Sequence, residues 1–261
     1  MGELFGRIFK EDIKSTILWL VIPLVFAIVF SQLLNIFGEN PLVVLGLGIT
    51  VIMVVVGPFI ALISVAVNDY DRFYGDFASL YSQLPIKSGS IIGARFFNYL
   101  CMAIIASITA VVNFFLIFYL VTVAPFTLNE LFDAMNRVFS TISTSNKVFM
   151  VFYMLIMAIT SIFQVMFAIT AGSSGIFGKA SKGKVVLLYI ILSLALGLIF
   201  TFIQKNAYLN YTNLEDMAVN IEVGVNKAYT SMLSPMIFNV VTAALMAYGS
   251  YYFHDKKLSV A

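Results

Sequence analysis

The stretch that decides the fold is Leu42–Val67, which reads LVVLGLGITVIMVVVGPFIALISVAV and holds no charged residue. It is longer than the roughly 20 residues that a helix needs to cross a hydrocarbon core about 30 Å thick, at a rise of about 1.5 Å per residue. The alternation typical of barrel strands is missing, so a helix is the spanning structure that remains. The stretch therefore predicts a transmembrane helix.

Five more stretches share this character, and none of them holds Asp, Glu, Lys, Arg or His. The six predicted spans are Ile17–Phe37, Leu42–Val67, Phe96–Val123, Val148–Ala171, Val185–Ile203 and Met232–Phe253. The chain of 261 residues is 61% hydrophobic and only 11% charged, whereas soluble domains carry about 25% charged residues. We therefore predict an all-α integral membrane protein, with six transmembrane helices in a single domain over residues 1–261.

The orientation follows from the lysines and arginines, which are enriched in cytoplasmic segments of membrane proteins. If the N-terminus is inside, most of these residues lie in inner segments: Arg7, Lys10, Lys14, Arg72, Lys87, Arg95, Lys179, Lys182, Lys184, Lys256 and Lys257. The outer segments then hold only Arg137, Lys147, Lys205 and Lys227. This distribution predicts that both termini lie in the cytoplasm.

The N-terminal segment 3–14 has two faces when it is drawn as a helix. Its apolar residues Leu4, Phe5, Ile8 and Phe9 share one face, and the opposite face carries Arg7, Lys10, Glu11 and Lys14. This pattern predicts an amphipathic helix in the inner interface of the membrane. A plain juxtamembrane start with snorkelling lysines is the alternative.

The longest inner segment runs from Asn68 to Arg95. Its apolar residues recur at helical spacing, at Phe73, Phe77, Leu80 and Leu84, which predicts a short amphipathic helix that ends before Pro85. Such a helix between two spans is a surface that a soluble motor could push. The alternative is a peripheral helix that rests at the interface.

Several kinds of chemistry have no residues to support them. The lone Cys101 and the lone His254 offer neither a disulfide nor a metal site, and no phosphate-binding GxxxxGK[ST] loop is present. The absence of ionisable residues in the six stretches argues against proton-coupled transport and intramembrane catalysis, although sodium sites built from backbone and hydroxyl groups stay open. The net charge of +2 does not suggest a nucleic-acid partner. We therefore expect no catalytic or metal site, and an energy source on a partner.

The layout resembles the membrane permease subunits of type-2 ABC exporters, which have an amphipathic N-terminal helix, six spans and a coupling helix between the second and third. The most specific match is the segment DFASLYSQLPI at 76–86, followed by SGSIIGAR at 88–95. The charged end, HDKKL at 254–258, also looks like that family's tail. Family membership implies a bacterial cytoplasmic membrane, a second permease subunit that is identical or related, and a separate ATPase in two copies that binds ATP and magnesium.

The resemblance also implies roles for individual residues. The coupling helix would dock on the ATPase through Asp71, Arg72, Phe73, Asp76, Phe77 and Leu80, with apolar members filling a groove and charged members fixing the register. The N-terminal helix, with Arg7, Lys10 and Lys14, would make a second contact with the ATPase or with lipid headgroups.

A substrate path would use the uncharged polar residues of the spans, which are Gln32, Asn35, Asn113, Gln164 and Asn239. An uncharged, aromatic-rich interior suits an amphipathic or hydrophobic cargo, such as a peptide, toxin, drug or lipid. The alternative is that these residues join helices by hydrogen bonds worth about 0.6–2 kcal/mol each.

Two other functions compete with the exporter permease. A gradient-driven channel or carrier would transport by itself in liposomes, and a membrane scaffold would bind a partner without moving cargo.

Overall fold

A computed structural model describes residues 1–38, 40–82, 86–121, 133, 136, 137, 140, 144–174, 180–209 and 233–256. The described residues form helices and connecting turns, with no strand among them. Six of the helices are long and apolar enough to span a membrane, which confirms the prediction of an all-helical, multi-pass membrane protein. Each predicted span lies within one of these helices, and the helices extend beyond the predicted bounds, except that Thr122, Val123 and Met232 lie outside the described residues.

The chain divides into two compact units, Met1–Leu131 and Phe132–Ala261. The first contains the spanning helices α1 (Gly2–Phe37), α2 (Pro41–Phe73) and α4 (Ser88–Val121), and the short α3 (Ala78–Ser82). The second contains α6 (Thr144–Gly172), α7 (Lys182–Leu209) and α10 (Leu233–Lys256). A single domain over 1–261 stays a prediction.

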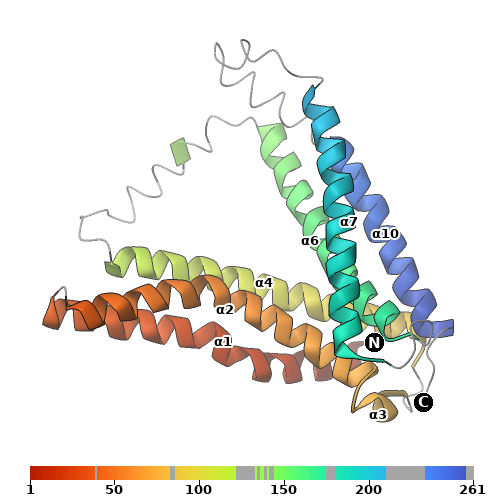
Figure 1. Cartoon of the computed structure of the whole chain (residues 1–261), viewed down its shortest axis with the longest axis horizontal. Coiled ribbons are helices and arrows are strands. Elements are labelled where there is room, and N and C mark those ends of the chain that lie inside the picture. Colours follow the sequence, from red (N-terminus) through yellow and green to blue (C-terminus); the bar gives the residue numbers. More distant parts are fainter. Residues whose placement is uncertain are drawn as a thin grey trace. The chain divides into compact units, whose positions relative to one another are not determined.

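In the first unit, α1, α2 and α4 pack against one another in all three pairings (Figure 1). Leu20, Ala61 and Ala106, one from each helix, form a buried apolar cluster. Small residues at such contacts let helix backbones approach closely, which is how helices associate within a membrane. Because consecutive helices run in opposite directions, the start of α1, the end of α2 and the start of α4 meet at the same end of this unit.

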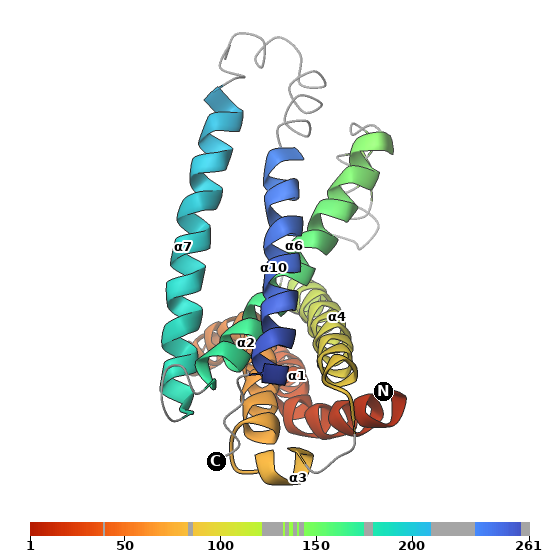
Figure 2. The ribbon, with the colours of Figure 1, turned by 90° about the vertical axis from the view of Figure 1, so that its right-hand side faces the viewer.

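The N-terminal segment differs from its expected form. Residues 3–14 are the first turns of α1, which continues without interruption from Gly2 to Phe37. No proline stands before Pro23, so nothing in the sequence ends the helix ahead of the first span. Figure 2 shows the N-terminal part of α1 running in a different direction from the rest. Ser15 and Thr16 donate to the carbonyl oxygen of Asp12 at 2.9 and 2.8 Å, a bonding pattern that bends helices.

The segment after the second span also differs from the single helix expected. The second helix continues to Phe73, and a turn then leads into α3. Within this turn the backbone nitrogens of Tyr74 and Gly75 both bond the carbonyl of Tyr70, at 2.8 and 2.9 Å. A Cβ atom on Gly75 would stand 2.9 Å from the Cα of Asp71, so the turn needs a glycine there. Leu84 and Pro85 lie outside the described residues.

In the second unit, α6 packs against both α7 and α10, and α7 also contacts α10. The rings of Phe167 and Phe253 meet edge to face with centroids 5.9 Å apart. Phe167 also covers Gly249, where a Cβ atom would come within 2.6 Å of the ring. Glycine at this position lets α6 and α10 approach closely.

Candidate functional site

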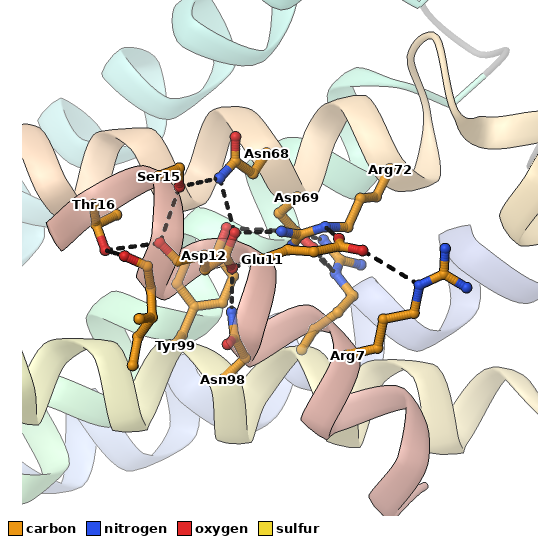
Figure 3. A network of polar contacts seen from close by, with 12 residues as sticks. Arg7, Glu11, Asp12, Ser15, Thr16, Asn68, Asp69, Arg72, Asn98 and Tyr99 are labelled. Carbon is orange, nitrogen blue, oxygen red and sulfur yellow. Dashed lines mark hydrogen bonds and ion pairs between the residues drawn. The ribbon is translucent and has the colours of Figure 1, made fainter.

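The most distinctive feature of the first unit is a buried network of charged and amide side chains (Figure 3). We call it the charge network; its members are Glu11, Asp12, Asn68, Asp69, Arg72, Tyr74, Arg95, Asn98 and Tyr99. It lies where α1 and α4 begin and α2 ends. Four of its members are carboxylate or guanidinium side chains at most 5% exposed, namely Asp12, Asp69, Arg72 and Arg95. Charges are buried in proteins only when they are paired and hydrogen-bonded, and the network meets this requirement.

Asp12 is the centre of the network and is fully buried. Its Oδ1 accepts hydrogen bonds from the amide of Asn68, at 2.8 Å, and from the guanidinium of Arg72. Its Oδ2 accepts from a second nitrogen of Arg72, at 3.2 Å, and from the amide of Asn98, at 2.6 Å. One carboxylate therefore joins α1 to both α2 and α4.

A second carboxylate, Asp69, forms the adjacent layer. Arg95 donates to it from Nε at 2.9 Å and from Nη2 at 2.6 Å, the two-pronged geometry that suits a guanidinium and a carboxylate. The hydroxyl of Tyr99 adds a hydrogen bond of 3.2 Å to Asp69, and Arg95 also donates to the hydroxyl of Tyr74 at 3.1 Å. The guanidinium lies 5.4 Å from the ring centroid of Phe73. This layer joins α2 to α4.

Arg72 connects the buried layers to the surface. Its Nε donates to Oε2 of Glu11 at 3.0 Å, and Glu11 also accepts from Tyr81 at 3.3 Å and from Arg7 at 3.3 Å. Burial raises the pKa of the Tyr81 phenol above its ordinary value of about 10, and the nearby Glu11 carboxylate adds to this effect. Tyr81 is therefore protonated at neutral pH and donates to Glu11.

A groove of about 370 Å³ opens beside these residues. We call it the Phe77 groove, and it is lined by Arg7, Glu11, Ser15, Asn68, Asp71, Arg72, Phe77 and Tyr81. One wall comes from α1, and the other comes from the end of α2 and the segment that follows it. Phe77 is 57% exposed although it lies beyond the end of the second span. An aromatic side chain exposed outside the spans is the type of residue that anchors protein interfaces.

The residues predicted for ATPase coupling fall into two groups. Arg72 and Phe73 are buried at the end of α2, where Arg72 belongs to the charge network. Asp76 and Phe77 are exposed, and Asp71 is half-buried beside the groove. The side chain of Leu80 lies outside the described residues. The structure thus brings Asp71, Arg72 and Phe77 together at the groove and directs Phe73 into the protein.

Of the predicted N-terminal contacts, Arg7 lines the groove, and Lys10 and Lys14 are exposed on α1. On the predicted apolar face of this segment, Leu4 and Ile8 are buried and Phe5 and Phe9 are half-buried.

The residues predicted for a substrate path are divided between the two units. Gln32 and Asn35 are exposed near the end of α1, and Asn113 is fully buried in α4 with no hydrogen-bond partner for its amide among the described residues. In the second unit, Gln164 of α6 donates to Ser193 of α7 at 2.6 Å. Asn239 of α10 donates to the carbonyl of Pro235 in its own helix at 2.9 Å.

Sequence reasoning missed most of the charge network. Asp12 could have been found, because it stands at four-residue spacing in a stripe with Leu4, Ile8 and Thr16, all of them buried. A carboxylate in an apolar stripe predicts a buried partner. Arg95 was placed just ahead of the third span, whereas α4 begins at Ser88 and carries Arg95 inside the bundle.

We compared the chain with protein-family models, curated proteins and solved structures, and none of the three comparisons gave a match.

Proposed function

We propose that the chain is the membrane-spanning permease subunit of an ATP-driven type-2 ABC exporter. A separate ATPase subunit, present in two copies, would supply the energy, and a second permease subunit would complete the path. The cargo would be amphipathic or hydrophobic, such as a peptide, toxin, drug or lipid, and it would leave the cell. Both termini and the Phe77 groove would lie on the cytoplasmic side of a bacterial cytoplasmic membrane.

The observation that carries this proposal is the exposed Phe77 beside a groove with charged walls, just beyond the second span. The hydrocarbon core does not explain the exposure, because Phe77 lies outside the helices that are long and apolar enough to span a membrane. A partner that covers Phe77 would bury a large aromatic surface, and burial of one such side chain contributes about 1.5–3 kcal/mol. Asp71, Asp76, Arg7 and Glu11 would fix the register of that contact.

The N-terminal segment contributes to the same surface, because Arg7 and Glu11 of α1 form one wall of the groove. Lys10 and Lys14, which are exposed, would interact with anionic headgroups or with the partner. This revises the roles implied by the resemblance: Arg72 and Phe73 would support the docking surface from within, while Phe77 and Asp76 would touch the ATPase.

The experiment that tests the proposal is an affinity pull-down of the chain from detergent-solubilised native membranes, with ATPase activity measured on the eluate. We expect an ATPase subunit in near-equal amount, lost in the Phe77→Asp variant and kept in the Phe77→Leu control. Phe73→Asp is unsuitable as a test because it would disturb folding. Phe73 is only 8% exposed, and its ring centroid lies 5.2 Å from that of Tyr81. A wild-type chain that elutes without any ATPase would contradict the proposal.

A gradient-driven carrier is the second candidate, and one observation favours it. Asp12 and Asp69 are buried carboxylates inside helices that qualify as membrane spans, and ionisable residues there mark ion or proton pathways in many transporters. Each of the two carboxylates forms an ion pair with an arginine of another helix, which fits a structural role in joining the helices. Gradient-driven flux through the purified chain in liposomes would support the carrier instead.

A further inference from the structure

We infer that Asp12 is the positioning residue that makes α1, α2 and α4 one body at the end of the unit that carries the Phe77 groove. The inference rests on the proposed function in one respect: a partner that presses on the groove would then move three spans together, and not α2 alone. Three steps of the geometry lead to it.

The first step is the composition of the groove walls. Arg7, Glu11 and Ser15 stand on α1, whereas Asn68 and Arg72 stand on α2. The groove therefore keeps its shape only while α1 and α2 stay in register.

The second step is that Asp12 sets this register from behind the groove. Its two carboxylate oxygens accept two hydrogen bonds from Arg72 and one from Asn68, both residues of α2. They also accept one hydrogen bond from Asn98 of α4. Arg72 in turn reaches forward to Glu11 at 3.0 Å. The carboxylate thus lies between the groove wall and the third span.

The third step is that a separate contact joins α2 to α4. Asp69 and Arg95 join α2 to α4 without using Asp12. Asn98 of α4 bonds to α1 through Asp12, so loss of the Asp12 charge should loosen α1 from α4 while the α2–α4 pair stays in place. The contacts of Arg72 with Glu11 and of Asn68 with Ser15 still join α1 to α2. Arg72 would keep a carboxylate partner in Glu11, so an Asp12→Asn variant leaves no orphaned buried charge.

The test measures distances between spin labels in the full chain, reconstituted in lipid nanodiscs. Cys101 is the chain's one cysteine, so a Cys101→Ala background accepts new labels cleanly. Lys10, Val67 and Gly89 are exposed positions on α1, α2 and α4, and a Cβ on Gly89 would meet nothing within 4 Å. The label pairs are Lys10→Cys with Gly89→Cys, and Val67→Cys with Gly89→Cys.

We expect one narrow distance population for both pairs when the network is intact. Asp12→Asn should add a longer population to the α1–α4 pair and leave the α2–α4 pair narrow, while Glu3→Gln, an exposed acid on the same helix, should change neither. If Asp12→Asn does not fold, the double variant Asp12→Asn with Arg72→Gln removes both charges and should give the same result. A narrow, unshifted α1–α4 distribution in a folded variant would overturn the inference.

A second arm uses the complex with the ATPase that co-purifies. If the three helices move as one body, the α1–α4 and α2–α4 label distances should be the same without nucleotide and after trapping with ATP and vanadate. A change in either distance on trapping would overturn the inference even if docking is confirmed. If no ATPase co-purifies, the proposed function fails, and the nanodisc measurements on the chain alone still decide whether Asp12 holds the three helices together.

Discussion

Gly57 of α2 lies against the carbonyl oxygen of Trp19 in α1, where a Cβ atom would stand only 2.7 Å from that oxygen. This carbonyl is the one that Pro23 leaves without its helical hydrogen bond, since proline has no N–H to donate four residues on. The missing side chain of Gly57 lets α2 approach this exposed carbonyl. A proline in one helix and a glycine in the next are therefore complementary features of one contact.

The first prediction follows from this contact. Gly57→Ala should lower the stability of the first unit by about 1–3 kcal/mol, because the new methyl group meets backbone that cannot rotate away. Gly48→Ala on the same helix is the matched control, since a Cβ there meets nothing within 4 Å, and it should be neutral or slightly stabilising. Trp19 is the chain's single tryptophan, so thermal unfolding followed by its fluorescence reports on this contact directly. Equal melting temperatures for the two variants would contradict the close packing.

The second prediction concerns the layer of Asp69 and Arg95. Arg95→Met removes the main partner of a buried carboxylate and should destabilise the protein by about 3–5 kcal/mol. Combining it with Asp69→Asn removes the uncompensated charge and should recover part of the loss. A double-mutant cycle of thermal or denaturant unfolding measures the coupling. Additive effects of the two changes would show that the pair contributes no specific interaction.

The third prediction separates a substrate path from helix contacts in the second unit. Gln164→Leu should remove the hydrogen bond to Ser193 and cost about 0.6–2 kcal/mol of stability, while leaving the rate of ATP-driven cargo transport close to that of the wild type. Ser161→Ala is the control, because Ser161 is exposed on the same helix and its hydroxyl donates within that helix. Loss of transport in a stable Gln164→Leu variant would contradict this and support a role for Gln164 in the substrate path.

The fourth prediction is a pH dependence at the groove. Because the pKa of Tyr81 is raised in the folded protein, the contribution of its protonated form is fully present below about pH 10, the ordinary pKa of a phenol. It is lost as the pH rises through the higher pKa of the folded state. The wild type should therefore lose stability in that alkaline range more steeply than Tyr81→Phe. Parallel pH curves for the two proteins in thermal unfolding would contradict this.

The number and approximate bounds of the spans were predictable because hydrophobicity alone decides them. Leu42–Val67 needs no knowledge of its neighbours to be recognised as a spanning helix. The ends of the helices were less predictable, since a charge was taken as a membrane boundary. Arg95 shows why this failed: a buried arginine is tolerated when a carboxylate on another helix faces it, and that carboxylate is 26 positions away in the sequence.

The division of the segment after the second span could also not be deduced from periodicity. Phe73 and Phe77 have the spacing of one helical face, yet Phe73 is buried and Phe77 is exposed because the chain turns between them. Gly75 was the local signal for that turn. The groove is lined by Arg7, Asp71, Arg72 and Phe77, which sequence reasoning had singled out, but that reasoning did not find Asp12, whose partners come from two other helices.

The central place of Asp12 has a consequence for biosynthesis. Ribosomes produce α1 first, and the partners of Asp12 on α2 and α4 are translated only later. During that interval the carboxylate has no arginine to neutralise it, and burying it alone would be costly. We therefore expect the start of α1 to remain at the water-facing membrane surface until the third span has inserted, so that this end of the first unit assembles after translation of α4 and not helix by helix.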